Sequence, residues 1–249
     1  MIAIIIQARL GSSRLPQKMG RLFYQSETLL GVLLERLNEA AIGLPIILAT
    51  SANEQDKLLV TIADSKRIQW FQGDEANVLA RFIEAAEVYN VKKIIRICAD
   101  NPFIDIESLK ALIEETDNSD YDYISFAYND IPVIKTHFGF WGEAVKLSAL
   151  KKVHQLTNVK PYLEHVTKYI YEHPELFSIK WLSLPSEIAQ RKDIRLTVDT
   201  AEDFRIAQEI FEAVYTRNEH FSIRDVLKYL DTHPAYLAQM KEQITLNEK

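Results

Sequence analysis

The residues best suited to chemistry stand near the amino end, in a polar loop that follows an apolar run. The run from Ile2 to Ile6 is short and β-branched, which favours a buried strand over a helix. Backbone N–H groups around a glycine can turn toward an anion, and nearby cations supply the positive charge that a triphosphate requires. The loop is therefore predicted to bind phosphate at an edge of an α/β sheet. Its candidate residues are Arg9, Gly11, Ser12, Ser13, Arg14 and Lys18.

This loop does not match the two best-known phosphate-binding sequences. It lacks the Gly-x-x-x-x-Gly-Lys-Ser/Thr spacing of a P-loop and the Gly-x-Gly-x-x-Gly spacing of a dinucleotide site. From the loop alone, a solvated basic turn without a ligand is an equal alternative. Residues farther along the chain must therefore decide between the two interpretations.

Two aspartates come at the ends of predicted strands. Asp100 follows the apolar run 94–97, and Pro102 prevents that strand from continuing inside a sheet. Asp199 follows the alternating segment 194–198. Both carboxylates are expected at the same sheet edge as the basic loop, because ligands of α/β sheets bind where parallel strands end.

Such a pair of carboxylates suits a metal site. Two carboxylates repel each other, but Mg²⁺ between them and the phosphates of a nucleotide restores neutrality, and Mg²⁺ prefers hard oxygen ligands. The alternative is that Asp100 begins a turn and Asp199 precedes a helix cap, since Thr200 and Asp203 resemble the first turn of a helix. Taken together with the basic loop, the metal site is the interpretation that we favour.

The elements that would position these residues alternate along the chain. Helical periodicity falls between the short apolar runs, and this alternation predicts an α/β fold with a mostly parallel sheet that helices cover on both faces. The runs predict strands at 2–6, 45–49, 68–71, 93–97 and 123–126. The predicted helices lie at 28–40, 55–64, 76–89 and 106–115.

From about residue 127 to 192 this alternation breaks. We expect a single domain over 1–249 with an inserted lobe over 127–192 that binds sugar, contacts a second copy of the chain, or does both. The aromatic segment 137–142 is a candidate for a sugar-stacking wall, a lobe core or a dimer contact. The other expected elements are a helix pair over 148–171, a strand near 177–182, a strand at 194–198, a helix at 201–215 and two further helices.

Composition and charge limit the class of partner. The chain has 249 residues, of which 47% are hydrophobic, enough for a full core. A net charge of −6 argues against broad binding to nucleic acid or to an anionic membrane, so we expect a small-molecule partner. No apolar stretch approaches the length of a membrane span and the start does not resemble a secretory signal, so we expect a cytoplasmic location. The single cysteine, Cys98, excludes an intrachain disulfide and is expected in the core.

Several short motifs lie between residue 7 and residue 203, and their order along the chain is informative. They are Gln7-Ala8-Arg9, Gly11-Ser12-Ser13-Arg14-Leu15-Pro16 with Lys18, Ala49-Thr50-Ser51, Gly73-Asp74-Glu75 with Val78-Leu79 and Arg81-Phe82, Arg96 with Ala99-Asp100-Asn101-Pro102 and Ile104-Asp105, Glu164-His165-Val166-Thr167, and Leu196-Thr197-Val198-Asp199-Thr200 with Asp203. In this order they resemble the cytidylyltransferases of the spore coat polysaccharide biosynthesis protein F type. Those enzymes are similar to the CMP-sialic acid and CMP-3-deoxy-manno-octulosonate synthetases.

The resemblance implies a Rossmann-like nucleotide-diphospho-sugar transferase fold and a Mg²⁺-dependent transfer of CMP from CTP to a sugar. An acidic keto-sugar is the implied acceptor, surface polysaccharide synthesis the implied pathway, and a homodimer the implied assembly. The implied catalytic residues are Arg14, Lys18, Asp100 and Asp199, of which the two aspartates bind Mg²⁺. The implied nucleotide-binding residues are Gln7, Ala8, Arg9, Gly11, Ser12, Ser13, Arg14, Lys18, Thr50, Ser51, Asn77 and Arg81. The implied sugar-binding residues are Asn101, Glu143 and His165.

Two other functions stay open from the sequence. One is a nucleotidyltransferase that uses another NTP and a sugar or polyol phosphate, because nothing in the sequence fixes cytosine as the base. The other is a non-catalytic relative that binds a nucleotide or sugar, because Asn77 and Ala80 replace acids that the family commonly carries. Against the second of these, both Asp100 and Asp199 are present.

Overall fold

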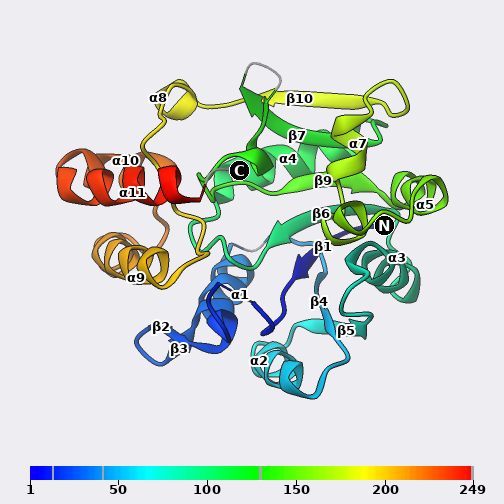
Figure 1. The fold of residues 1–249 in the computed structure, drawn as a ribbon, viewed down its shortest axis with the longest axis horizontal. Helices are drawn as coiled ribbons and strands as arrows, with labels where there is room; N and C mark the ends of the chain where they lie inside the picture. The colour runs from blue at the N-terminus through cyan, green and yellow to red at the C-terminus, as the bar shows by residue number, and fades with distance from the viewer. Residues whose placement is uncertain (13, 41, 129–130, 248–249) are drawn as a thin grey trace.

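The central feature of the computed structural model, which describes residues 1–12, 14–40, 42–128 and 131–247, is a twisted sheet (Figure 1). Within these residues eight strands form that sheet, in the spatial order β10-β7-β9-β6-β1-β4-β5, with β8 paired to β7. The strands are β1 (Ile2–Gln7), β4 (Ile46–Ser51), β5 (Gln69–Gly73), β6 (Lys93–Cys98), β7 (Tyr123–Tyr128), β8 (Ile131–Pro132), β9 (Glu143–Lys146) and β10 (Ile179–Ser183). A separate hairpin pairs β2 (Leu22–Tyr24) with β3 (Glu27–Thr28).

Most of the central sheet is parallel, as the alternation of strands and helices predicts. Strand β1 pairs in parallel with β4 on one side and β6 on the other, and Ile5 faces Ile47 and Arg96 across these two ladders. Strand β9 runs antiparallel between β6 and β7, while β10 pairs in parallel with β7 at the edge. The carboxyl ends of β1, β4, β5 and β6 consequently meet at one edge of the sheet.

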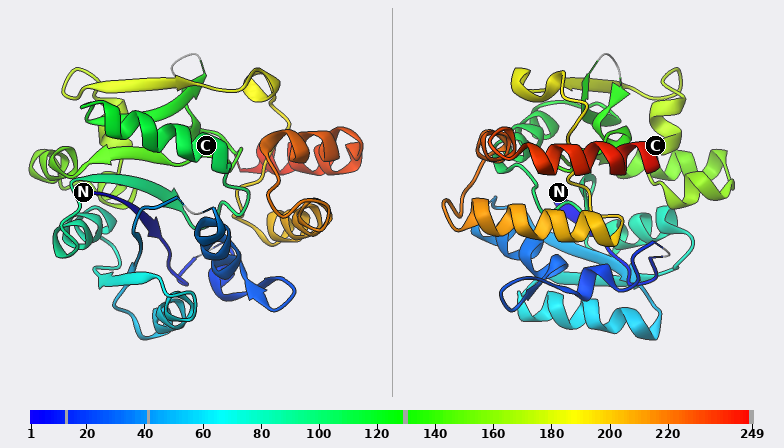
Figure 2. Two further views of the ribbon diagram at one scale, coloured as in Figure 1. Left: turned by 180° about the vertical axis from the view of Figure 1, so that it is seen from behind. Right: turned by 60° about the vertical axis from the view of Figure 1, so that its left-hand side comes forward.

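Helices cover both faces of the sheet. Figure 1 shows α9, α10 and α11 on one side and α3 and α5 on the other, and the two views in Figure 2 agree. The helices are α1 (Leu29–Glu39), α2 (Lys57–Ser65), α3 (Val78–Val88), α4 (Ile106–Asn118), α5 (Leu147–Leu156), α6 (Lys160–Glu164), α7 (Lys168–Glu172), α8 (Ser186–Ala189), α9 (Ala201–Tyr215), α10 (Ile223–Asp231) and α11 (Pro234–Leu246). The short 3-10 helices are η1 (Lys18–Gly20), η2 (Glu54–Asp56) and η3 (Val133–Lys135).

Strand β1 is apolar throughout because it feeds two cores. Ile4 and Ile6 pack in the core that α1, α4 and α9 cover, whereas Ala3 and Ile5 pack in the core beneath α3 and α5. Successive side chains of a strand point to opposite faces, so both sets are fully buried. The rigid strand thereby fixes the start of the polar loop that follows it.

One predicted strand is wrong. The segment 194–198 is extended and mostly buried, but it pairs with no strand among the described residues. Instead, the backbone N–H of Leu196 donates to the carbonyl oxygen of His137 at 2.8 Å, and that of Val198 donates to the carbonyl oxygen of Asp100 at 3.0 Å. Periodicity correctly indicates the buried side chains, but it does not reveal that two different loops satisfy the backbone.

The segment 127–192 is woven into the main sheet. It supplies β9, which the sequence does not predict, inside the sheet and β10 at its edge. The expected helix pair over 148–171 forms three shorter helices, α5 to α7. The role of this segment in sugar binding or in contact with a second copy stays a prediction. Within the described part of the chain, no helix is both long and apolar enough to cross a membrane.

Candidate functional site

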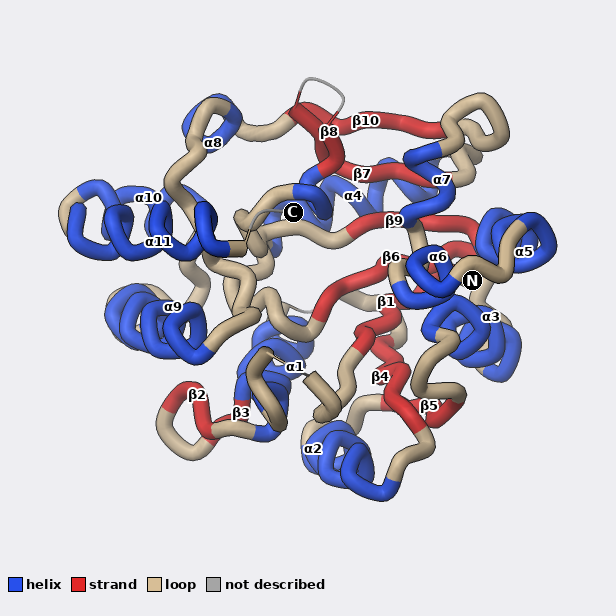
Figure 3. The backbone as a smooth tube through the Cα atoms, viewed as in Figure 1, coloured by secondary structure: helices blue, strands red, loops and turns tan. Residues whose placement is uncertain are grey.

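The candidate site lies at the edge where the parallel strands end. Figure 3 shows the loops that leave β1 and β6 on the same side of the sheet as the extended segment before α9. A loop after a parallel strand points its first residues toward this edge, which is where ligands of α/β sheets bind. Three stretches far apart in the sequence thus meet here: 7–18, 98–102 and 195–200.

The ammonium group of Lys18 joins the two predicted metal ligands. Its Nζ lies 3.0 Å from Asp100 Oδ2 and 3.8 Å from Asp199 Oδ1, and it also donates to the carbonyl oxygen of Val198 at 2.6 Å. Both Lys18 and Asp199 are more than nine-tenths buried. The two carboxylates therefore face one another across a cation, although Asp199 does not follow a strand as predicted.

A glycine lets the two chain segments around Asp199 cross. Gly139 has a φ of +74°, and a Cβ placed on it would lie 2.9 Å from the backbone carbon of Leu196. The aromatic side chains on either side of it, Phe138 and Phe140, are buried in the core rather than exposed. This part of the aromatic segment serves as core, and its backbone supports the Asp199 segment.

The buried carboxylate of Asp56 holds the start of the basic loop by a hydrogen bond. Asp56 Oδ1 accepts a hydrogen bond from the backbone N–H of Leu10 at 2.7 Å, and Asp56 Oδ2 accepts one from Ser51 Oγ at 2.5 Å. Farther along the loop, Ser12 Oγ accepts from the backbone N–H of Leu15, and Arg14 Nη2 contacts Asp199 Oδ1 at 2.7 Å. The structure thus brings Ser51 to the loop as a support. Ser13, predicted to bind nucleotide, lies outside the described residues.

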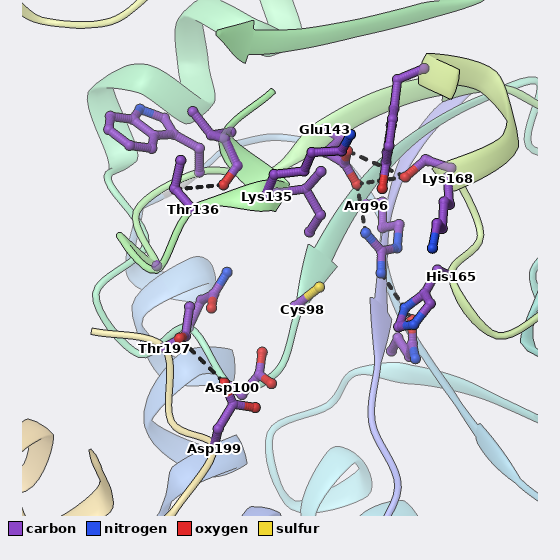
Figure 4. A pocket seen from close by; sticks show the side chains of 18 of the residues that line it. Arg96, Cys98, Asp100, Lys135, Thr136, Glu143, His165, Lys168, Thr197 and Asp199 are labelled. Carbon is purple, nitrogen blue, oxygen red and sulfur yellow. Dashed lines mark hydrogen bonds and ion pairs between the residues drawn. The ribbon is translucent and has the colours of Figure 1, made fainter. Parts of the chain in front are cut away.

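A cavity of about 850 Å³ opens beside the two aspartates. Figure 4 shows Asp100 and Asp199 next to each other at one end of it, and Arg96, Glu143, His165 and Lys168 at the other. Cys98, expected in the core, is only half-buried and lines the wall between the two ends. Asn101 and Gln7 also line this cavity.

At its far end, the cavity wall contains a buried polar network. Glu143 is 2% exposed, and its carboxylate accepts hydrogen bonds from Arg96 Nη1 at 2.5 Å, from Tyr123 Oη, and from Thr167 Oγ1 at 3.1 Å. Burial, reinforced by the adjacent carboxylate, raises the pKa of Tyr123 well above its usual value, so its hydroxyl remains a donor. Arg96 Nη2 in turn donates to Gln7 Oε1 at 3.3 Å. Glu143 therefore shapes the cavity wall with its oxygens already hydrogen-bonded.

The residues predicted near the nucleobase form a second cluster. Arg81 is fully buried; its Nη1 donates to the carbonyl oxygen of Asp74 at 2.8 Å, while Nε and Nη2 have no hydrogen-bond partner among the described residues. Burial, together with the nearby charge of Arg9, lowers the pKa of Arg81 to about 10. Thr50 Oγ1 is likewise buried without a partner in the described part of the chain. Asn77 caps α3 by accepting the N–H of Ala80 at 2.9 Å.

Comparison with known proteins identifies the family. The sequence matches the cytidylyltransferase family over residues 3–242. The chain belongs to this family. The spore coat polysaccharide biosynthesis protein SpsF of Bacillus subtilis is 32% identical over 240 residues, which cover 94% of this chain and 95% of that protein. The predicted resemblance is therefore confirmed.

Solved structures agree with the fold of this cytidylyltransferase. A cytidylyltransferase from Leptospira borgpetersenii superposes with a TM-score of 0.82 at 27% identity, covering 95% of this chain and 96% of the other. The CMP:2-keto-3-deoxy-manno-octonic acid synthetase complexed with CTP gives a TM-score of 0.62 at 15% identity, covering 85% of this chain and 98% of the other. The predicted α/β nucleotidyltransferase fold is confirmed.

The cytidylyltransferase fold gathers most of the predicted site residues at one edge. Three ion pairs link Arg14, Lys18, Asp100 and Asp199 in a chain: Arg14 with Asp199, and Lys18 with both aspartates. Arg9 lies apart from them, with its Nη2 2.9 Å from Glu164 Oε1. Of the remaining residues predicted to bind nucleotide, Gln7, Thr50 and Ser51 end strands β1 and β4, Ala8, Gly11 and Ser12 lie on the loop after β1, Asn77 caps α3, and Arg81 lies in the first turn of α3.

Some residues of this site carry no recognisable sequence signal. Lys135 and Tyr171 line the cavity from η3 and α7 but stand in no motif, whereas Lys168, which also lines it, directly follows the motif 164–167. Arg195 is buried and contacts Asp199 from within the extended segment. Only the fold brings these residues to the site, so sequence reasoning misses them.

The donor set fits a divalent cation shared with a substrate. Among the described residues no group of three or more His, Cys, Asp or Glu side chains is arranged to hold a metal. Asp100 and Asp199 supply two hard carboxylate ligands, and Mg²⁺ is commonly bound by one or two carboxylates together with waters and substrate phosphates. The site therefore suits a metal that arrives with a nucleotide, in place of the contacts that Lys18 and Arg14 make.

Proposed function

We propose that this cytidylyltransferase transfers CMP from CTP to an acidic keto-sugar, releases pyrophosphate, and uses Mg²⁺ held by Asp100 and Asp199. The observation that carries the proposal is the position of the Lys18 ammonium between these two carboxylates, beside a cavity large enough for a sugar. The Lys18 ammonium already lies between the two carboxylates, where a positive charge must balance their negative charge. The name of the relative SpsF supports a place in polysaccharide synthesis.

Residues of the basic loop are suited to the triphosphate. Arg14 is half-exposed and Lys18 is buried, and both would turn from the carboxylates to the triphosphate when a metal takes the place of their present contacts. Negative charge builds on pyrophosphate as it leaves, and preorganised cations stabilise that charge in a water-poor site. Arg14 and Lys18 would thus act on the leaving group, while Arg9 and Ser12 would bind the phosphates.

The base would bind at Arg81 once the residues that cover this buried side chain move aside. Its two unpartnered N–H donors, Nε and Nη2, and the unpartnered hydroxyl of Thr50 are buried polar groups that gain a hydrogen bond when a base supplies acceptors. The pyrimidine ring of cytosine carries a carbonyl oxygen and a ring nitrogen that accept. Arg81 and Thr50 are therefore the residues that would select the base.

In the reaction, a sugar hydroxyl forms a new bond to the α-phosphorus of CTP and loses its proton to solvent water, as the bond to pyrophosphate breaks on the opposite side. Mg²⁺, when bound, would neutralise phosphate charge and polarise the attacking hydroxyl. The chain's own residues hold the two substrates in line: the loop after β1 grips the phosphates and the cavity grips the sugar. Little proton chemistry is required of the protein.

One lysine of the cavity supports an acidic acceptor, although the charged residues of its lining balance as a whole: Arg14, Arg96, Lys135 and Lys168 against Asp100, Glu143, Glu172 and Asp199. Lys168 lies 4.0 Å from Glu172, so the argument depends on Lys135. Lys135 and Lys168 enter it from different elements, and no carboxylate among the described residues lies within 4.0 Å of the Lys135 ammonium, which sits 5.1 Å from the ring of Tyr171. An ammonium group without an acid partner attracts a substrate carboxylate. Asn101 and His165 would contact the sugar hydroxyls. We also propose that the enzyme acts in the cytoplasm, where CTP is made, and as a homodimer.

The test is pyrophosphate release with Mg²⁺ and each NTP in turn, across a panel of keto-sugar acids and sugar or polyol phosphates. Turnover with CTP and a keto-sugar acid is expected. Turnover with another NTP and a sugar or polyol phosphate would instead identify a nucleotidyltransferase of different substrates, the first alternative that the sequence leaves open. Nucleotide binding without turnover of any acceptor would favour the non-catalytic relative. Light scattering at several protein concentrations would test the dimer.

A further inference from the structure

Arg195 is a buried cation beside a predicted metal ligand. Its side chain is 0% exposed, and its guanidinium makes a two-pronged contact with Asp203, from Nε to Oδ1 at 2.7 Å and from Nη2 to Oδ2 at 2.8 Å. Nη2 also lies 3.4 Å from Asp199 Oδ2. The third nitrogen, Nη1, lies 2.5 Å from Nδ1 of His137, which accepts its hydrogen bond.

The two oxygens of Asp199 consequently have different surroundings. Oδ2 faces inward, toward Arg195 and the hydroxyl of Thr197 at 3.5 Å. Oδ1 faces Arg14 at 2.7 Å and Lys18 at 3.8 Å, on the side of the other aspartate. The carboxylate is thus held by one oxygen and presents the other to the cation position.

We propose that Arg195 is the positioning residue of Asp199: it fixes the carboxylate so that Oδ1 is directed at the bound metal. This inference rests on the proposed function, since it assumes that Asp199 binds a divalent cation. A carboxylate held in one rotamer loses little freedom when it coordinates a metal, and hydrogen-bonding partners of metal ligands tune metal affinity in this way.

Only a planar fork can make these contacts together. The guanidinium uses Nε and Nη2 for Asp203 and still has Nη1 for His137, so it links the start of α9 to the loop that carries His137. An ammonium is a single point charge and cannot span both partners while it reaches Asp199. Arg195→Lys should therefore keep the buried charge and lose the orientation.

A matched control stands four residues earlier. Arg191 makes the same kind of contact with Asp193, from Nε to Oδ1 at 2.7 Å, and also pairs with Asp231 at 2.8 Å. It lies away from both predicted metal ligands. Arg191→Met thus removes an arginine–aspartate pair from the same segment without touching the site.

The experiment compares wild type, Arg195→Lys, Arg195→Met and Arg191→Met. Binding of Mn²⁺ in the presence of CTP is measured by electron paramagnetic resonance, the Mg²⁺ concentration for half-maximal pyrophosphate release by titration, and the fold by circular dichroism melting. We expect Arg195→Lys to melt cooperatively, bind CTP in EDTA like wild type, and need about 10- to 100-fold more of either metal. Arg191→Met should match the wild-type metal dependence.

Unchanged metal affinity in folded Arg195→Lys would overturn the inference and leave Arg195 as a residue of the fold alone. An equal loss in Arg191→Met would overturn it as well, since any damage to this segment would then suffice. Should Arg195→Met fail to fold, the lysine variant still decides. If wild type itself binds no Mn²⁺ with CTP, the proposed function fails instead, so the two failures are distinguishable.

Discussion

The backbone N–H of Val198 donates a hydrogen bond to the carbonyl oxygen of Asp100 at 3.0 Å. Because Asp199 is the next residue, this contact keeps the backbones that carry the two carboxylates close together. No strand pairing is needed to bring them together. The buried ammonium of Lys18 links the same two segments, because it donates hydrogen bonds to the carbonyl oxygen of Val198 and to the carboxylate of Asp100.

Asp199→Asn should stop turnover and leave the fold intact. In the variant Lys18 keeps its contact with Asp100 and Arg195 keeps its contact with Asp203, so neither buried cation loses its only counter-charge. We expect pyrophosphate release to fall by about 100-fold or more, with a melting temperature within about 4 °C of wild type.

The control for this change is Asp193→Asn, which weakens the contact with Arg191 in the same segment and should retain activity. If Asp199→Asn melts far below Asp193→Asn, the carboxylate is a structural group and the metal proposal loses its main support.

Gly139→Ala should cost more stability than Gly43→Ala. The two glycines have nearly the same positive φ, +74° and +73°, a region that strains alanine at both positions by about 1–2 kcal/mol. Only at position 139 would the new Cβ also press on the backbone of Leu196, whereas nothing lies within 4 Å at position 43. We expect an additional loss of roughly 1–3 kcal/mol for Gly139→Ala.

Urea unfolding of both glycine variants measures this difference, and pyrophosphate release should fall in Gly139→Ala alone, since the Asp199 segment moves. Equal stability losses in the two variants would mean that the crossing of the segments tolerates a methyl group.

Arg81→Gln should weaken CTP binding without weakening the fold. The change removes a buried charge of which two nitrogens lack partners, but it also loses the hydrogen bond to Asp74, so the free energy of unfolding without ligand should change by about 1 kcal/mol or less. Each lost hydrogen bond between the guanidinium and the base should cost about 1.5–3 kcal/mol of affinity, roughly 10- to 100-fold.

Calorimetric titration with CTP and with UTP, alongside melting curves, checks both parts of this prediction. Arg224→Gln, at an exposed residue on α10 that pairs with Glu187, is the control. Severe destabilisation of Arg81→Gln with unchanged nucleotide affinity would show that Arg81 serves the fold.

Acid should unfold the protein partly through Asp203. Although burial opposes it, the hydrogen bonds and charge of Arg195 and the backbone N–H groups of Thr200 and Asp199 lower the pKa of Asp203 below its usual value. The unfolded chain then binds the proton more readily, so this contribution to stability is fully present above about pH 5 and is lost as the pH falls below about 4.

Urea unfolding from pH 7 down to pH 3 measures this loss, which should be smaller in Asp203→Asn because that side chain does not titrate. Parallel pH profiles for wild type and Asp203→Asn would show that other carboxylates dominate acid unfolding.

Local patterns predicted the elements well where the local chain decides them. The run Ile2 to Ile6 became β1 because a β-branched strand buried on both faces must be apolar throughout. Thr200 and Asp203 became the reciprocal cap of α9, since both hydrogen bonds of a capping box lie within four residues.

Long-range contacts account for the errors. The alternation at 194–198 reported correctly that these side chains are buried, but not which backbone groups the segment would meet. Strand β9 went unpredicted because its place between β6 and β7 depends on the loops that carry it there.

The sequence by itself determined the fold class, through the alternation of strand and helix patterns, and the family, through the resemblance of its motifs in order. Residue type and local spacing also singled out the basic loop and the two aspartates as candidates. Only the tertiary structure decided that Lys18 would stand between the aspartates and that Arg195 would hold one of them. The same folding brought Lys135 and Lys168 to one cavity. The physical reason is that hydrogen bonds and ion pairs act over only a few ångströms. Residues far apart in the sequence come that close only when the whole sheet and its helices pack together.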